Sequence, residues 1–248
     1  MRLLASLLVL PLALGGCLDG IVGGGDAGPK DYASDRSYKT WVVEVDHSTG
    51  ATPDGALLDF VKGRLNGMVR KEGIEFRADE TLATDGSRAW SDADVQALAE
   101  QHQGLKTGGS QAVTHLLFLT GHSASDSGDR KVLGVTYGHH LVAIFSDSVK
   151  AACTAPLPIL GCDASPYFRA VLVHEFGHVL GLVNNGAAMV HPHEAGTCGS
   201  APDRGHSANR DSVMYCQVES SLAFTLFGSG GPPTDFDDND RADIHALQ

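Results

Sequence analysis

Residues 165–182 read SPYFRAVLVHEFGHVLGL, and this stretch decides how the rest of the chain is interpreted. The Ser-Pro pair at its start favours a helix, because proline is well tolerated at the first helical position. Apolar residues then occupy nearly every side of the predicted helix, which is therefore expected to be buried. Its middle nevertheless holds His174, Glu175 and His178, and buried titratable groups are costly unless something pairs with them. A bound metal ion would provide such a partner.

The spacing of these three residues supports a metal site. His174 and His178 are four positions apart, so both imidazoles leave one face of a helix about one turn apart and can reach a single Zn²⁺ ion. Glu175 lies beside the first histidine, where it can hold a water molecule instead of the metal itself. This His-Glu-x-x-His arrangement is typical of zinc peptidases. It predicts zinc as the cofactor and Glu175 as the general base.

Residues 174–181, HEFGHVLG, resemble the active-site motif of the metzincin clan of metallopeptidases. In that clan the glycine, here Gly181, ends the helix so that the chain can turn under the metal and deliver a third ligand. A methionine-containing turn follows beneath the site, and residues 211–215, DSVMY, match it with Met214. The resemblance covers residues 174–215 and implies a peptidase with a metzincin-like fold. The role of Tyr215, beside this methionine, stays open, with a structural role favoured.

The chain departs from the metzincin pattern at the third zinc ligand. The clan usually places that ligand three residues after the glycine, where this chain has Asn184, and asparagine is a poor zinc ligand. The following loop offers His191, His193 and His206 instead. His206 is favoured because residues 206–214 keep the histidine-to-methionine spacing of archaemetzincins, with serines in place of two cysteines. The resemblance thus implies an archaemetzincin-like segment with an insertion before the third ligand.

Three alternatives stay open at this point. A gluzincin would take a glutamate as its third ligand, and Glu194 and Glu219 are the downstream candidates. The chain could instead keep zinc only to stabilise a non-catalytic binding lipoprotein, or it could hydrolyse a substrate that is not a peptide. Glu175 discriminates between catalysis and scaffolding, since a scaffold needs the histidines but not the base.

The first 16 residues predict a lipoprotein signal peptide. Arg2 precedes an apolar stretch that is too short for a spanning helix of about 20 residues. Residues 14–17, LGGC, resemble a bacterial lipobox, in which the cysteine is lipidated and becomes the mature N-terminus. The expected location is therefore the bacterial cell envelope, with the chain exported and attached to a membrane through lipid on Cys17.

Composition sets the expected domains and partners. The Gly- and Asp-rich residues 17–38 predict a flexible tether after the signal peptide (1–16), and residues 39–248 predict one catalytic domain. The formal charge of −12, from 18 basic and 30 acidic side chains, argues against a nucleic-acid partner. The expected partners are a peptide or protein substrate and the membrane, and the expected oligomeric state is a monomer.

Five cysteines are an odd number for an exported protein, and lipidation of Cys17 would leave four. An even number in an oxidising compartment suggests two disulfides. Of the three possible connectivities, pairing neighbours in the sequence predicts Cys153–Cys162 and Cys198–Cys216. The second bridge would close the loop that carries the favoured third ligand.

The hydrophobic pattern upstream of the motif predicts an α+β fold with a mixed, twisted sheet flanked by helices. A buried helix with the HExxH motif follows, and then a small C-terminal subdomain that ends in a helix over about residues 237–247. Residues 141–145 are expected to form a rim strand that pairs with an extended substrate. The predicted strands are 40–45, 74–77, 115–120, 132–137 and 141–145, and the predicted helices before the motif are 54–71 and 91–102.

Overall fold

The computed structural model describes residues 27–84, 86, 88–127, 130–154, 163–198, 201–218, 226–227 and 231–248. The predicted signal peptide, Cys17, Cys162 and Glu219 lie outside the described residues. Within the described ranges, no helix is both long and apolar enough to cross a membrane.

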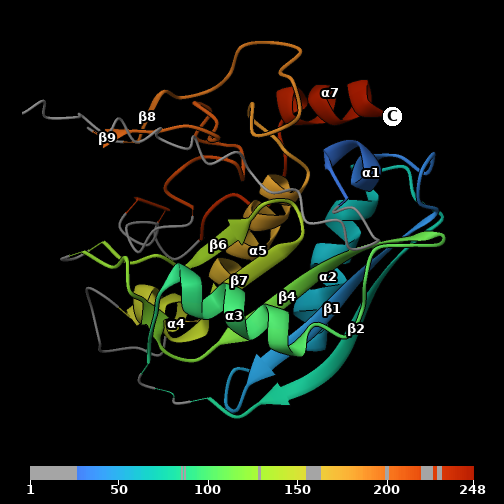
Figure 1. Ribbon diagram of the computed structural model, residues 1–248. Coiled ribbons are helices and arrows are strands. Elements are labelled where there is room, and N and C mark those ends of the chain that lie inside the picture. Colours follow the sequence, from blue (N-terminus) through green and yellow to red (C-terminus); the bar gives the residue numbers. More distant parts are fainter. Residues whose placement is uncertain are drawn as a thin grey trace, which may run out of the picture.

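The centre of the structure is a five-stranded sheet with the strand order β2-β1-β4-β7-β6 (Figure 1). The first four strands in this order run parallel to one another, while β6 runs antiparallel to β7 and forms an edge of the sheet. The strands are β1 (Thr40–Ser48), β2 (Gly73–Leu82), β4 (Gln111–Leu119), β6 (Gly134–Tyr137) and β7 (Leu141–Phe145).

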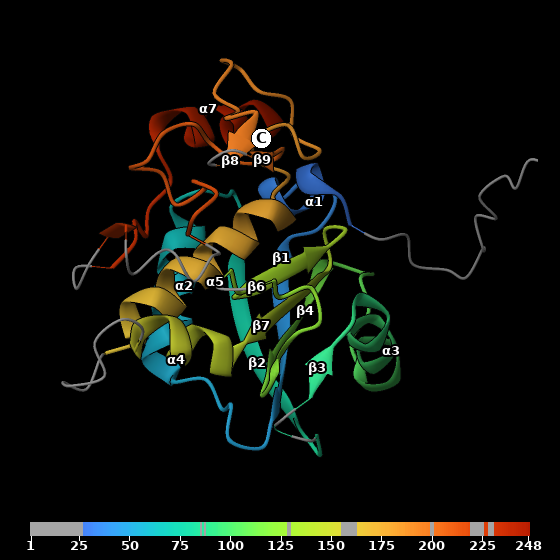
Figure 2. The ribbon, with the colours of Figure 1, turned by 90° about the vertical axis from the view of Figure 1, so that its left-hand side faces the viewer.

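Helices cover both faces of this sheet (Figure 2). Helices α2 (Gly55–Asn66), α4 (Ser146–Thr154) and α5 (Ser165–Val179) lie on one face, and α3 (Asp92–His102) lies on the other. Strand β4 shows the alternation that this requires, because Leu116 and Phe118 join the core beneath α5, whereas Leu117 and Leu119 join the core beneath α3. The prediction of a mixed sheet flanked by helices is confirmed.

Local sequence explains where the helices begin. Asp54 caps α2 by accepting a hydrogen bond from the Ala56 N–H, and Ser91 and Asp94 form a reciprocal capping box at the start of α3. Helix α5 has a proline in its first turn instead, as the Ser-Pro pair predicts. The N–H groups of the first turn of a helix have no partner within the helix. In α2 and α3 side chains accept hydrogen bonds from some of them, and in α5 the proline has no N–H.

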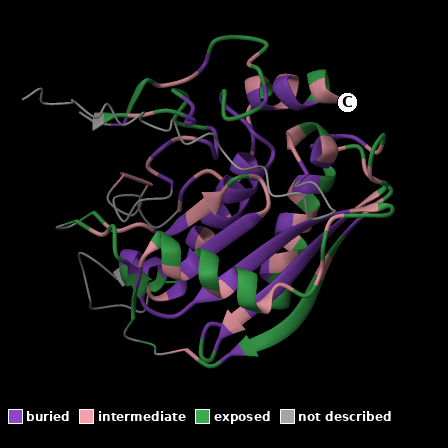
Figure 3. Cartoon of the chain, in the orientation of Figure 1, coloured by how far each residue is buried: buried purple, intermediate pink, exposed green. Residues whose placement is uncertain are grey.

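The core on the α5 face is built around large aromatic side chains. Trp41 of β1 packs edge-on against Phe176 of α5, with ring centroids 5.6 Å apart. The Trp41 indole N–H also donates a hydrogen bond to the Thr114 hydroxyl (2.9 Å), so its polar atom is satisfied in the interior. Figure 3 shows that the central strands are buried, while the outer strand β2 is largely exposed. The middle of α5 thus packs on a buried, apolar core.

A smaller region follows α5 and lies above the sheet in Figure 1. It consists mainly of loops and contains the short strands β8 (Thr197–Cys198) and β9 (Ala201–Pro202) and the last helix, α7 (Asp238–Leu247). A separate pair of two-residue strands, β3 (Ala89–Trp90) and β5 (His122–Ser123), lies beside the sheet. The described residues therefore end in a helix, as predicted.

The N-terminal segment differs from the sequence expectation. Part of the tether expected over residues 17–38 forms helix α1 (Pro29–Ala33), and Tyr32 and Ala33 are fully buried. The Tyr32 hydroxyl donates a hydrogen bond to the Val113 carbonyl oxygen in β4 (2.8 Å). The segment is packed because an aromatic and a small residue within the polar stretch reach the core, which composition alone does not reveal. The described fold therefore includes residues from Ala27 on, ahead of the expected domain start at residue 39.

The rim strand also differs from the expectation. Residues 141–145 form β7, whose two sides are occupied by β4 and β6, so β7 cannot pair with a further strand. The edge belongs to β6, and β7 is interior because it forms the second arm of the hairpin and then pairs with the long strand β4. The prediction that residues 141–145 form the rim was wrong.

Candidate metal centre

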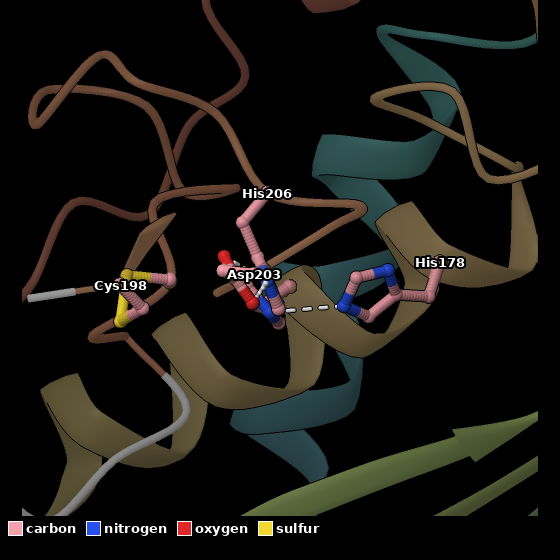
Figure 4. Close-up of a disulfide and its surroundings, with 6 residues drawn as sticks. His178, Cys198, Asp203 and His206 are labelled. Carbon is pink, nitrogen blue, oxygen red and sulfur yellow. Dashed lines mark hydrogen bonds and ion pairs between the residues drawn. A yellow bond between two sulfur atoms is a disulfide. The ribbon is translucent and has the colours of Figure 1, made fainter. Parts of the chain in front are cut away.

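Three imidazoles meet where the end of α5 faces the following loop. His174 and His178 come from α5, and His206 comes from the loop after β9. One ligand atom of each lies within 4.8 Å of the others. The ring of His206 has its centroid 5.2 Å from that of His174 and 5.0 Å from that of His178. Figure 4 shows His206 and Asp203 projecting from the loop towards the helix that carries His178.

The distance between the two helical histidines fits a shared cation. The Nε2 atoms of His174 and His178 are 3.1 Å apart. Two nitrogens that each lie about 2.05 Å from a tetrahedral zinc ion are about 3.3 Å apart. The donor set also suits the ion, since imidazole nitrogens are common zinc ligands. The three histidines therefore form a group that can hold a metal ion, with His174 fully buried and His206 nearly so.

Hydrogen bonds behind the rings orient two of the three imidazoles. The His174 Nδ1 lies 2.6 Å from the Val213 carbonyl oxygen, to which it can only donate. The His206 Nδ1 lies 2.9 Å from the nearer carboxylate oxygen of Asp203. An Nδ1–H donor leaves Nε2 as the unprotonated, ligating nitrogen, which is the usual orientation of metal-binding histidines. The surroundings thus select the tautomer that a metal requires.

A sharp reversal after α5 allows the chain to return over the helix. Gly181 (φ +72°), Val183 (φ +55°) and Asn184 (φ +62°) all have left-handed backbone conformations. A Cβ atom on Gly181 would lie 2.5 Å from Cγ of Pro29 and 2.8 Å from the Ala187 nitrogen, so no side chain fits there. Val183 is β-branched and strained in this conformation. Asn184, where metzincins have a ligand, is exposed.

The loop that carries His206 is fastened on both sides of that residue. The His206 carbonyl oxygen accepts a hydrogen bond from the Ala195 N–H (2.9 Å), and the Ser207 N–H donates to the Met214 carbonyl oxygen (2.8 Å). A disulfide joins Cys198 to Cys216, which are 18 positions apart, and encloses both His206 and Met214 (Figure 4). The sequence analysis predicted this pairing. Cys153 is also disulfide-bonded, and its expected partner lies outside the described residues.

Met214 lies directly beneath the helical histidines. Its side chain is fully buried, and a Cβ atom on Gly177 would overlap its sulfur atom. Gly177 lies between the two helical histidines in the sequence, so the absence of a side chain there lets the turn reach the helix. The turn also supplies the Val213 carbonyl oxygen that orients His174. Residues 211–215 thus form a floor for the centre, where the sequence analysis expected a methionine turn.

Glu175 lies between α5 and the edge strand β6. Its side chain is fully buried, and its Oε2 accepts a hydrogen bond from the Thr136 hydroxyl (2.7 Å). A Cβ atom on Gly134 would lie only 2.7 Å from the other carboxylate oxygen, so the glycine leaves room for the carboxylate. Strand β6 therefore holds the glutamate by a hydrogen bond from Thr136 and by close packing at Gly134.

The other predicted candidates do not join this group. His191 is exposed, and His193 is buried against two aspartates of α7, with its Nε2 3.5 Å from Asp240 Oδ1. Glu194 accepts a hydrogen bond from the Gly205 N–H (3.0 Å) and therefore supports the loop. Tyr215 packs edge-on against Phe227, with the ring centroids 6.5 Å apart.

Sequence reasoning missed two residues that support the centre. Asp203 lies three positions before His206, a spacing that is too common in loops to single it out. Thr136 is 39 positions before Glu175, and only the pairing of β6 with β7 brings it close. Neither residue belongs to a recognisable motif.

Comparisons with known proteins give matches in structure but not in sequence. No protein-family model and no curated protein matches the chain. Among solved structures, archaemetzincin from Methanopyrus kandleri aligns with 86% of this chain and 96% of its own, with a TM-score of 0.49 and 13% identity. Metalloproteinase-II from Bacteroides fragilis aligns with 85% of this chain, with a TM-score of 0.48 and 11% identity. The alignment covers 54% of that second protein.

Proposed function

We propose that the chain is an exported, lipid-anchored zinc endopeptidase of the metzincin type. The observation that carries the proposal is the convergence of His174, His178 and His206 beside Glu175. His206 comes from a loop far from the motif helix in sequence, yet its imidazole meets the other two with a carboxylate behind it. Two histidines on a helix without a metal role would not need a third imidazole, oriented by a carboxylate, beside them.

The donor set supports zinc as the ion. Three neutral imidazoles leave one position of a tetrahedral ion open, which is the pattern of catalytic zinc sites, whereas structural sites use four protein ligands. When bound, zinc supplies Lewis acidity, which lowers the pKa of a water molecule and polarises a carbonyl group. His174, His178 and His206 would hold the ion, and Asp203 would keep His206 in the required tautomer.

Glu175 has the position of a general base. It follows His174 directly on α5, and the Thr136 hydroxyl fixes one of its carboxylate oxygens. In this role Glu175 takes a proton from the attacking water and then passes it to the leaving amine. Thr136 keeps the carboxylate from rotating away, which is a positioning role and not a chemical one.

The edge of the sheet suits a peptide substrate. Strand β6 is an edge strand, and it carries both Gly134 and Thr136, which contact Glu175. An extended peptide that pairs with β6 through main-chain hydrogen bonds would pass beside the general base. The edge strand beside Glu175 therefore favours a peptide over other substrates of a zinc hydrolase.

Variants of Glu175 test the activity. Wild-type chain should retain zinc after dialysis and cleave a casein substrate, and Glu175→Gln should retain the zinc while losing at least about a hundredfold in cleavage rate. If wild type holds zinc but cleaves no peptide, the peptidase proposal fails, and the alternatives of a binding lipoprotein or a non-peptide hydrolase remain. Wild type without zinc at neutral pH would sink the proposal.

The lipid anchor rests on the sequence alone and has its own test. Residues 14–17 support it, together with the short apolar stretch before them. In a bacterial host, wild type should incorporate labelled palmitate and enter the detergent phase, whereas Cys17→Ser should do neither. Labelling that persists in Cys17→Ser would contradict the anchor without affecting the peptidase proposal.

A further inference from the structure

A second group of buried polar side chains lies between the loop that carries His206 and the last helix. His193 comes from that loop, and Asp240 and Asp243 come from α7. The His193 Nε2 lies 3.5 Å from Asp240 Oδ1 and 3.7 Å from Asp243 Oδ2. The side chain of His193 is 4% exposed, and those of both aspartates are 0% exposed.

The imidazole of His193 is oriented like those of the first group. Its Nδ1 lies 2.8 Å from the His191 carbonyl oxygen, to which it can only donate. In the neutral ring, Nε2 is then the unprotonated nitrogen and an acceptor. This acceptor faces the two carboxylates of α7, and it makes no hydrogen bond.

Each carboxylate has one oxygen in hydrogen bonds and one oxygen turned towards His193. Oδ2 of Asp240 accepts from the Ser212 hydroxyl (2.6 Å), and Oδ1 of Asp243 accepts from the Val190 N–H (2.6 Å). The remaining oxygens, Asp240 Oδ1 and Asp243 Oδ2, are buried without a hydrogen-bond partner. Ligating carboxylates in proteins are held by hydrogen bonds to neighbouring groups in this way.

Three buried polar atoms that face one another without a hydrogen bond need a proton or a metal cation between them. Their distances, 3.5 Å and 3.7 Å, exceed those of direct charged hydrogen bonds, which are about 2.7–2.9 Å. Burial of the charges is costly without such a cation, and it raises the pKa of Asp240 to about 6 and also that of Asp243.

We propose that His193, Asp240 and Asp243 bind a second divalent transition-metal ion of the zinc class. One imidazole and two carboxylates suit such an ion, whereas calcium and magnesium prefer oxygen donors alone. Two carboxylates also balance its charge. Among the described residues, only the first group has donors that all lie within 4.8 Å of one another. The donors of the second group are therefore further apart, and an ion bound there would draw the carboxylates inward.

The ion would fasten three segments around the first centre. Val190 and His193 belong to the loop that leads to His206, and Ser212 belongs to the turn that contains Met214. The loop contacts both aspartates of α7, and the turn contacts Asp240. The site is therefore structural, and it does not depend on the proposed peptidase activity.

Metal content of the purified, full-length chain tests the proposal, with zinc as the only metal added. After dialysis, wild type should hold about two zinc ions per chain and Asp243→Asn about one, as measured by inductively coupled plasma mass spectrometry. Asp238→Asn changes an exposed aspartate in the first turn of the same helix and should still hold two. His178→Ala should hold one, and the His178→Ala/Asp243→Asn double variant none.

These five proteins together separate the two centres. One ion in wild type that is lost in His178→Ala would overturn the second site and leave the first. If wild type holds one ion and Asp243→Asn loses it, the second site is supported and the first site is contradicted.

A spectroscopic measurement covers the case in which a variant folds poorly. Cobalt(II) added to wild type should give absorption bands from two environments, and Asp243→Asn should lose one set while the other stays unchanged. Circular dichroism checks that each variant is folded. A single set of bands in wild type that survives in Asp243→Asn would overturn the proposal, because a proton would then occupy the cluster.

Discussion

Gly177 is the residue on which the contact between α5 and the methionine turn depends. A Cβ atom there would overlap the Met214 sulfur and lie 3.2 Å from the Phe236 ring. Alanine favours a helix over glycine by about 1 kcal/mol, but overpacking a closed core costs about 1–3 kcal/mol. We therefore expect Gly177→Ala to lower the free energy of unfolding and weaken zinc binding, measured by urea unfolding and competition with a chelator.

A matched control exists on the neighbouring helix. Gly63 in α2 is exposed, and a Cβ atom there would meet nothing within 4 Å. Gly63→Ala should leave zinc binding unchanged and raise stability by up to about 1 kcal/mol. Equal effects of the two substitutions would show that the space around Gly177 is not limiting.

Asp203 would influence a bound metal ion through its contact with His206. Asp203→Asn keeps the shape of the side chain but removes the charge that supports the Nδ1–H of the imidazole. Loss of such a partner typically weakens metal affinity about 10–100-fold. We expect a loss in this range, measured by competition with a chromophoric chelator. Asp211→Asn, at an exposed position in the same disulfide loop, should bind zinc as wild type does.

At the scale of elements, the disulfide holds the loop that provides the third imidazole. A bridge across 18 positions stabilises a fold by about 3 kcal/mol by restricting the unfolded chain. Changing Cys198 and Cys216 together to serine should lower the free energy of unfolding by about this amount and weaken zinc binding. Reduction of the wild type also breaks the bridge at Cys153, so it should lower the free energy of unfolding further and likewise weaken zinc binding. Unchanged zinc affinity in the serine variant would show that backbone hydrogen bonds alone hold His206.

The limits of sequence reasoning follow from the range of the contacts involved. His174 and His178 could be predicted because helical spacing alone puts them on one face. His206 could be predicted only through its spacing to Met214. Thr136 and Asp203 could not, since their roles depend on strand pairing and loop geometry that no local pattern encodes.

The same distinction applies to the elements. Most strands and helices around the sheet follow from hydrophobic periodicity, and their layered arrangement was predicted, but helix α4 was not. The order within the sheet was not, so residues 141–145 were placed at the rim when β6 is the edge. Helix α1 was missed because its five residues carry little periodicity, and only the burial of Tyr32 reveals its place.

At the scale of the whole molecule, Lys71 ties the N-terminal segment to the domain. Its ammonium group donates hydrogen bonds to the carbonyl oxygens of Asp31, Ser34 and Tyr38. Burial lowers the pKa of Lys71 to about 8. Between pH 8 and about 10.4 the unfolded chain therefore binds more protons at this position than the folded chain, and this group makes stability rise with pH.

Lys71→Met should remove that contribution. The difference in the free energy of unfolding between wild type and Lys71→Met should shift in favour of wild type as the pH rises from 8 to 10. The comparison is made by urea unfolding at a series of pH values, so that other titrating groups cancel. A difference that is constant with pH would contradict the lowered pKa of Lys71.

The position of the disulfide has a consequence for when the metal centre can form. Cys198 and Cys216 enclose His206 and Met214, whereas His174, Glu175 and His178 lie on a helix that needs no such bond. Disulfides form in oxidising compartments and are rare in the reducing cytosol. A newly made chain thus carries two of its three imidazoles on one helix, and the loop with the third gains the restraint of the disulfide only after oxidation. On the proposed export, the centre is then completed outside the cytosol, after the bridge has formed.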